Sequence, residues 1–177
     1  FMPQREVLRD EAFAASVWKE VAANADRHNE PGRFSAFAGY EWSSMPEIDN
    51  LHRVVIFRDG FDRTSQVRAF SAFDSQDPEE LWRYLAGYER KTGGEELAIP
   101  HNSNASNGRM FELKDMQGRA LTRDYAERRA RWEPLLEVTQ IKGDSEAHPL
   151  LSPDDAFADF ETWDRGNLLF SKPKETW

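Results

Sequence analysis

The sequence contains no cysteine, and this absence removes several kinds of chemistry at once. Disulfide frameworks, cysteine-ligated zinc and cysteine nucleophiles are excluded, so a bound metal must be held by histidine, aspartate, glutamate or water. Cysteine-free proteins function in the cytoplasm and in the periplasm alike, so the absence does not decide between these two compartments.

Long apolar runs and an excess of basic residues are also missing. No run approaches the roughly 20 apolar residues that span a bilayer, and no charged and then apolar beginning resembles a signal peptide. A formal charge of −9 and a pI near 5.0 oppose binding to a phosphate backbone, which normally rests on lysine and arginine. We therefore expect a soluble protein with neither a membrane nor a nucleic acid as its partner.

Several signature motifs are absent as well. The sequence has no phosphate-binding Gly-Lys-Ser/Thr loop, no Gly-x-Gly-x-x-Gly turn, no Gly-x-Ser-x-Gly elbow and no His-Glu-x-x-His helix. A nucleotide switch, a dinucleotide-binding enzyme, an esterase and a zinc protease of that type are therefore disfavoured.

What is present indicates one globular domain. A chain of 177 residues holds one hydrophobic core but leaves little room for two, and its six tryptophans and twelve phenylalanines need burial. The chain begins at Phe1 rather than at a methionine. We therefore expect residues 1–177 to form a single domain that is an excised or processed piece of a longer protein.

Helices and strands are predicted in a mainly alternating order. Apolar residues from Val7 to Ala25 recur at helical spacing, and Asp77-Pro78-Glu79-Glu80 opens a second helix that ends at Gly93-Gly94. Further helices are expected at 125–132 and from Ser152, and strands at 34–42, 51–57, 97–100 and 135–141. This order predicts an α/β fold with mainly parallel strands, whose ligands bind at the carboxyl ends of the strands.

Three of these strands carry a metal-ligand type near that end, namely Glu41, His101 and Glu137. A carboxylate within an apolar strand is costly unless it is paired or coordinated, and imidazole with carboxylates suits Zn, Mn or Fe. The alternatives are that Glu41 faces solvent, that His101 caps a turn, and that Glu137 pairs with an arginine (Arg123, Arg128, Arg129 or Arg131). Three such strand ends favour a metal site.

His52 stands at the beginning of its predicted strand, beside Arg53. This is the wrong end for such a site if the strand is parallel to its neighbours, although an antiparallel strand would reverse the argument. We therefore expect His52 to be structural. His28 is expected to end the first helix, where its charge favours the helix dipole.

The loop 140–148 combines acids, a histidine and a lysine directly after a predicted strand. Lys142 could hold an anionic group and His148 could transfer a proton, with Asp144 and Glu146 beside them as substrate-binding candidates. The alternative is a solvated polar loop. Asn102, next to His101, could likewise bind substrate or orient the histidine, although asparagine-rich turns are common without function.

At the same residues the sequence resembles the bacterial domain-of-unknown-function family 3604, a branch of the polymerase-and-histidinol-phosphatase (PHP) superfamily. The matching runs include Gly39-Tyr40-Glu41-Trp42, Ile99-Pro100-His101-Asn102 and the run from Gln140 to Glu146. The resemblance implies a partial (βα) barrel that acts on phosphoester-like bonds with two or three divalent metals. Glu41 resembles the bridging carboxylate, His101 the mid-chain histidine ligand and Glu137 the ligand of the following strand.

The opening His-x-His and closing Asp-x-His motifs of that superfamily are absent, so the chain resembles its central portion. The expected function is metal-dependent hydrolysis of a small anionic substrate by a metal-activated water. Two alternatives stay open. One is a noncatalytic module that binds ligands through exposed aromatics such as Trp42, Trp163 and Trp177, and the other is an inactive fragment.

Overall fold

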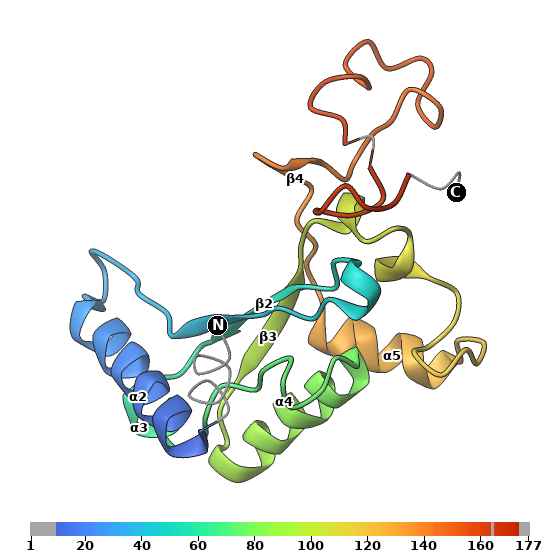
Figure 1. Cartoon of the computed structure of the whole chain (residues 1–177). Helices are drawn as coiled ribbons and strands as arrows, with labels where there is room; N and C mark the ends of the chain where they lie inside the picture. The colour runs from blue at the N-terminus through green and yellow to red at the C-terminus, as the bar shows by residue number, and fades with distance from the viewer. Residues whose placement is uncertain (1–9, 164, 174–177) are drawn as a thin grey trace. The chain divides into compact units, whose positions relative to one another are not determined.

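The computed structural model describes residues 10–163 and 165–173. Their contacts divide them into two compact units. The first unit comprises residues 10–42 and 54–98, and the second comprises 43–53, 99–163 and 165–173. Figure 1 shows the course of the chain through its helices and strands.

Strands β1 (Gly39–Trp42), β2 (Arg53–Phe57) and β3 (Glu96–Pro100) form one sheet in the order β1-β2-β3. The Phe57 N–H donates to the Ala38 carbonyl and the Leu51 N–H to the Ser44 carbonyl, so numbers fall along β1 as they rise along β2. Hydrogen bonds from Arg58 to Glu95 and from His101 to His52 show the same relation between β2 and β3. Neighbouring strands are therefore antiparallel.

The predicted PHP-like (βα) barrel with mainly parallel strands, and with it the TIM-like barrel, is wrong. The described residues form antiparallel sheets of three and two strands and close no barrel. The link 43–52 between β1 and β2 contains only the short 3-10 helix η1 (Pro46–Ile48), whereas a parallel crossover needs a dozen or more residues. Alternation of helices and strands permits a parallel sheet but does not require one.

The first unit contains α2 (Glu11–His28), α3 (Phe61–Thr64) and α4 (Pro78–Thr92). The predicted boundaries of α4 are confirmed: the Asp77 side chain accepts the Glu79 N–H, proline occupies the first turn, and Gly93 ends the helix with φ 66°. Left-handed backbone of this kind carries little cost only in glycine, so the helix stops where the sequence places one.

Aromatic side chains build the core of the first unit. The Phe57 ring of β2 lies 5.2 Å from Trp18 on α2 and 4.9 Å from Tyr88 on α4, centroid to centroid. The Trp18 indole N–H donates to the Thr64 carbonyl at 2.8 Å, which satisfies its polar atom inside the core. These contacts pack α2 and α4 against the sheet.

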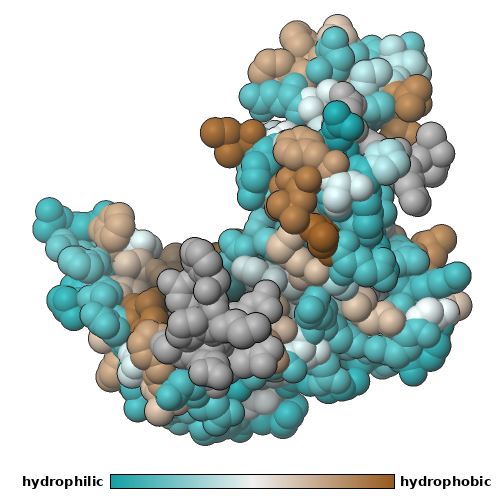
Figure 2. All heavy atoms as spheres, viewed as in Figure 1, coloured by the Kyte–Doolittle hydropathy of each residue, from teal (hydrophilic) through white to brown (hydrophobic). Residues whose placement is uncertain are grey.

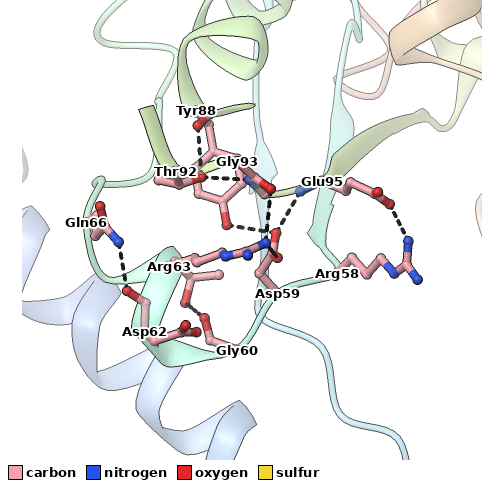
Figure 3. Close-up of polar contacts among 12 residues, drawn as sticks. Arg58, Asp59, Gly60, Asp62, Arg63, Gln66, Tyr88, Thr92, Gly93 and Glu95 are labelled. Carbon is pink, nitrogen blue, oxygen red and sulfur yellow. Dashed lines mark hydrogen bonds and ion pairs between the residues drawn. The ribbon is translucent and has the colours of Figure 1, made fainter. Parts of the chain in front are cut away.

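A polar network connects the residues that follow β2 with α4 and with the beginning of β3 (Figure 3). The Asp59 carboxylate accepts hydrogen bonds from the Arg63 guanidinium at 2.9 Å, the Tyr88 hydroxyl at 3.0 Å and the Glu95 N–H at 2.7 Å. Arg63 also donates to the Gly93 carbonyl at 3.0 Å. The network therefore ties the C-terminus of α4 to the strands on both sides of it.

Gly94 lies within this network, and its substitution by alanine is expected to destabilise the protein. A Cβ on Gly94 would lie 2.6 Å from Tyr88 Cε1 and would also clash with Asp59 Oδ2. We expect Gly94→Ala to lower the free energy of unfolding by about 1–3 kcal/mol, as overpacking does. Urea denaturation measures the change.

Gly87→Ala is the matched control, because a Cβ there meets nothing closer than Arg90 Nη2 at 3.8 Å. Gly87 lies inside α4, where alanine is favoured over glycine, so this variant should gain about 0.5–1 kcal/mol. Equal effects of the two substitutions would contradict the close packing around Gly94.

The second unit contains η1, η2 (Ser103–Ala105), η3 (Arg109–Phe111), α5 (Arg123–Trp132) and an antiparallel pair, β4 (Thr139–Gln140) with β5 (Gly143–Asp144). The strand predicted over 135–141 shrinks to Thr139–Gln140, and the residues before it, such as Leu135 and Val138, are exposed. The helix predicted from Ser152 is replaced by turns.

Candidate metal centre

The antiparallel direction of β2 gathers three metal-ligand side chains. Glu41 lies in the last half of β1, His52 immediately precedes β2, and His101 immediately follows β3. Each offers one ligand atom, and these atoms all lie within 4.8 Å of one another. Both histidines are buried and Glu41 is exposed, so the group is reached from the carboxylate side.

Main-chain contacts fix the two histidines relative to each other. The His101 N–H donates to the His52 carbonyl at 3.3 Å, and the ring centroids are 5.7 Å apart with an interplanar angle of 74°. The Asn50 side chain adds a second connection by donating to the carbonyls of His101 at 2.8 Å and Asn102 at 3.1 Å. The sheet and Asn50 therefore position both imidazoles.

The loop after β3 is buried despite its polar sequence, from His101 through Ser106. Asn102 turns the chain sharply with φ 51° and ψ 45°, a left-handed conformation that asparagine adopts more readily than most residues. The Asn50 N–H donates to the Ala105 carbonyl at 3.1 Å, so a backbone group of the loop finds its partner within the unit. Asn50 and the turn at Asn102 therefore hold this loop in place, and a role of Asn102 in substrate binding stays a prediction.

The donor set fits a transition metal. Two neutral imidazoles and one carboxylate are the ligands of many catalytic zinc sites, and the same set suits Mn and Fe. Ligand atoms about 2.1 Å from a shared ion lie at most about 4.2 Å apart. The observed limit of 4.8 Å therefore needs side-chain shifts of under one ångström to close around an ion.

Glu137 has a different setting. Its Oε1 accepts hydrogen bonds from the Asn102 N–H at 3.3 Å and from Gln140 Nε2 at 2.7 Å, and its own N–H donates to the Pro100 carbonyl at 3.1 Å. Among the described residues, the group of mutually close donor atoms does not include Glu137. Its role as a ligand stays a prediction, and the contact shown is with the backbone beside His101.

Three of the four arginines named as alternative partners of Glu137 form ion pairs with other carboxylates. Arg123 pairs with Glu127 at 2.7 Å, Arg128 with Asp124 at 3.1 Å and Arg129 with Glu133 at 3.1 Å. All three pairs join residues four apart, which is the spacing of neighbours on a helix face. They stabilise α5 and its end.

The loop 140–148 is attached to the His101 loop through Asn104. Asn104 Nδ2 donates to the Lys142 carbonyl at 3.0 Å, and the Asn104 N–H donates to Ser145 Oγ at 3.1 Å. Ser145 Oγ donates back to Asn104 Oδ1 at 3.3 Å. One asparagine therefore holds the β4–β5 hairpin against the loop that contains His101.

The other predicted site residues of this loop form local turns. Asp144 Oδ1 accepts the N–H groups of Glu146 at 3.2 Å and Ala147 at 3.3 Å, and His148 Nδ1 accepts the Leu150 N–H at 3.2 Å. Glu146 is exposed, and Lys142 and His148 are half-buried. Their catalytic and substrate-binding roles stay predictions.

His52 lies beside Glu41 and His101, whereas a parallel β2 would carry it to the far end of the sheet. The expectation of a structural role for His52 rested on that parallel direction. The signal that could have found His52 is the short link 43–52, which allows a hairpin but no crossover.

Comparison with known families places the chain. A family model described as "Protein of unknown function (DUF3604)" matches residues 2–176. The chain belongs to this family. The predicted membership of domain-of-unknown-function family 3604 is thus confirmed, and the match covers nearly the whole chain.

Searches of the curated proteins and of the solved structures found no match to the chain. Among its described residues no helix is long and apolar enough to cross a membrane.

Proposed function

We propose that this DUF3604 chain supplies a divalent-metal site to a metal-dependent hydrolase of phosphoester-like substrates. The observation that carries the proposal is the convergence of Glu41, His52 and His101, with their ligand atoms within 4.8 Å of one another. The resemblance of Glu41 and His101 to ligands of the PHP superfamily supports the same reaction class.

When bound, a divalent cation supplies a Lewis acid that activates water and stabilises the charge of the leaving oxygen. Glu41 brings one negative charge, and the two neutral imidazoles bring none. A site that holds a divalent ion would therefore retain a net charge of about +1, which attracts an anionic ester. With three protein donors, positions remain for water and substrate.

Residues of the loop 140–148, together with Asn102, take the remaining roles in this proposal. Lys142 is placed on the β4–β5 hairpin, which Asn104 fastens to the His101 loop, and it would neutralise an anionic group of the substrate. His148 would transfer a proton, with Asn102, Asp144 and Glu146 as polar contacts for the substrate.

A noncatalytic module that stacks ligands on exposed tryptophans has weaker support. Trp42 is fully buried, and its indole N–H donates to the Ser75 carbonyl at 3.2 Å. Trp163 is half-buried and lies 5.1 Å from the Phe170 ring, and Trp177 lies outside the described residues. Burial removes Trp42 from any stacking surface.

The test is metal content followed by activity. The chain is purified without chelator, and bound Zn, Mn and Fe are quantified by elemental analysis and by titration of the metal-free protein. We expect saturable binding of at least one ion per chain, and metal-dependent cleavage of a phosphodiester such as bis(p-nitrophenyl) phosphate. Absence of saturable metal binding would sink the proposal.

Substitutions of Glu137 separate a ligand from a support for the His101 loop. Glutamine keeps a carbonyl oxygen that can accept the Asn102 and Gln140 hydrogen bonds, so Glu137→Gln should change metal affinity by less than about tenfold if those bonds are its role. Glu137→Ala removes the acceptor and should cost about 10- to 100-fold, the usual effect of an outer partner. A loss of that size in Glu137→Gln would instead identify Glu137 as a ligand. Titration of the metal-free variants measures both affinities.

A further inference from the structure

A second site lies in the first unit, away from the metal ligands. A cavity of about 610 Å³ opens between α2, β1 and the segment that follows α3. Its wall includes Ala14, Val17 and Trp18 of α2, Tyr40 of β1, and Phe73. Successive side chains of a strand point to opposite faces, so Tyr40 and Glu41 belong to different sides of β1. The cavity is therefore distinct from the candidate metal centre.

The wall of this cavity is apolar and open to solvent. Val17 is 44% exposed and Phe73 is 53% exposed, although both are large apolar residues. In Figure 2 apolar residues are visible at the surface over α2, on the left of the view. A concave apolar surface of this volume is within the range of pockets that bind small molecules.

At the charged end of the cavity, three of the four N–H groups on the terminal nitrogens of Arg68 already donate hydrogen bonds. Nη1 donates to Asp74 at 2.8 Å and to the Ala69 carbonyl at 3.1 Å, while Nη2 donates to Asp74 at 2.6 Å. These hydrogen bonds hold the pKa of the Asp74 carboxyl below its usual range, so the pair stays ionised and closed. An anionic ligand would have to compete with the Asp74 carboxylate for the Arg68 guanidinium.

Glu11 is the acidic side chain that remains accessible on this wall. Its carboxylate is 3.8 Å from Arg68 Nη2, and its side chain is 84% exposed. Among the described residues that line the cavity, Glu11 and Asp74 carry two negative charges and Arg68 carries one positive charge, which gives these residues a net charge of −1. The chain as a whole carries −9. Both charges favour a cation.

We propose that this cavity binds a small cationic amphiphile, an alkyl or aryl group with a protonated amine. The apolar body packs against Val17, Trp18 and Phe73, where its burial supplies most of the binding free energy. The ammonium group meets the Glu11 carboxylate at the mouth. The negative charge of Glu11 favours a cationic head group, and the apolar wall favours an alkyl or aryl body.

Three eight-carbon probes that differ only in the head group test the proposal by isothermal titration calorimetry at pH 7. Octylamine, which is protonated at this pH, should bind saturably and more tightly than octan-1-ol, and octanoate should bind most weakly. Because an exposed ion pair contributes about 0.5–1 kcal/mol, the advantage of the amine over the alcohol should be about two- to fivefold. Octanoate binding as tight as octylamine binding, or no saturable binding of octylamine, would overturn the proposal.

Two pairs of variants locate the site. Ala14→Trp places an indole in the cavity and should abolish octylamine binding, whereas Ala12→Trp, on an exposed position of α2 outside the cavity wall, should not. Glu11→Gln should reduce octylamine affinity to that of octan-1-ol, and Glu20→Gln on the same helix should leave it unchanged. Glu11→Gln keeps the test decisive even if Ala14→Trp fails to fold. If Ala14→Trp and Glu11→Gln both bind octylamine like the wild type, the site lies elsewhere and the proposal is refuted.

Discussion

Glu133→Ala is expected to lower the free energy of unfolding by about 3–5 kcal/mol, because it removes the carboxylate that forms an ion pair with the buried guanidinium of Arg53. Glu133 Oε1 lies 2.9 Å from Arg53 Nε, and both side chains are only 1% exposed. Arg129 Nε reaches the other carboxylate oxygen at 3.1 Å, and Arg53 Nη1 also donates to the Leu51 carbonyl at 2.6 Å. Removing the carboxylate therefore breaks the connection between the end of α5 and the beginning of β2.

Glu127→Ala is the control for that variant. Glu127 pairs with Arg123 at 2.7 Å on the same helix, but the side chains are 92% exposed for Arg123 and 63% exposed for Glu127. An exposed pair contributes about 0–1 kcal/mol, so this variant should denature at nearly the wild-type urea concentration. A loss below about 1 kcal/mol in Glu133→Ala would mean that water or another group neutralises Arg53 and that the buried pair does not hold α5 in place.

The parts of the fold that could be predicted are those that depend on local chemistry. Asp77 and Pro78 open α4 and Gly93 ends it, because capping, proline geometry and left-handed backbone each act within one turn of helix. The positions of β2 and β3 also followed from short runs of apolar residues. These features need no knowledge of distant contacts.

The direction of β3 relative to β2 could not be predicted, because it depends on contacts between distant segments. The sequence from β2 to β3 contains α3 and α4 and is long enough for either a parallel or an antiparallel return. The run from Leu135 to Ile141 has the composition of a buried strand, yet Ile141 is 98% exposed and only Thr139–Gln140 pairs. An apolar run forms a strand only where a neighbouring strand accepts its hydrogen bonds.

The residues of the candidate site also differ in how far the sequence could identify them. Glu41 and His101 were selected because each lies near the carboxyl end of a strand, and β1 and β3, both antiparallel to β2, run in the same direction and bring these ends to one edge of the sheet. The expectation that His52 is structural depended on a parallel β2, and the antiparallel strand instead places His52 beside Glu41 and His101. Asn50 was not singled out, because its two side-chain hydrogen bonds to the His101 loop join positions about fifty residues apart.

His52→Ala is expected to reduce the affinity of the chain for zinc at least a hundredfold, about as much as His101→Ala. Loss of an outer partner alone commonly costs about 10- to 100-fold, and each of these variants removes one of three donor atoms. Competition with a chromophoric chelator measures the affinity, and far-UV circular dichroism checks that the variants are folded. The matched control is His28→Ala, since His28 is exposed at the end of α2.

Comparison of the zinc affinities of His52→Ala and His101→Ala also tests the antiparallel direction of β2. If β2 were parallel to its neighbours, His52 would stand at the far end of the sheet, so His52→Ala would bind zinc like the wild type while His101→Ala would not. Equal losses in the two variants are expected only when the antiparallel strand brings both imidazoles to one ion. A wild-type affinity in His52→Ala, with the fold intact, would remove His52 from the site and leave Glu41 and His101 as too few donors to hold zinc tightly.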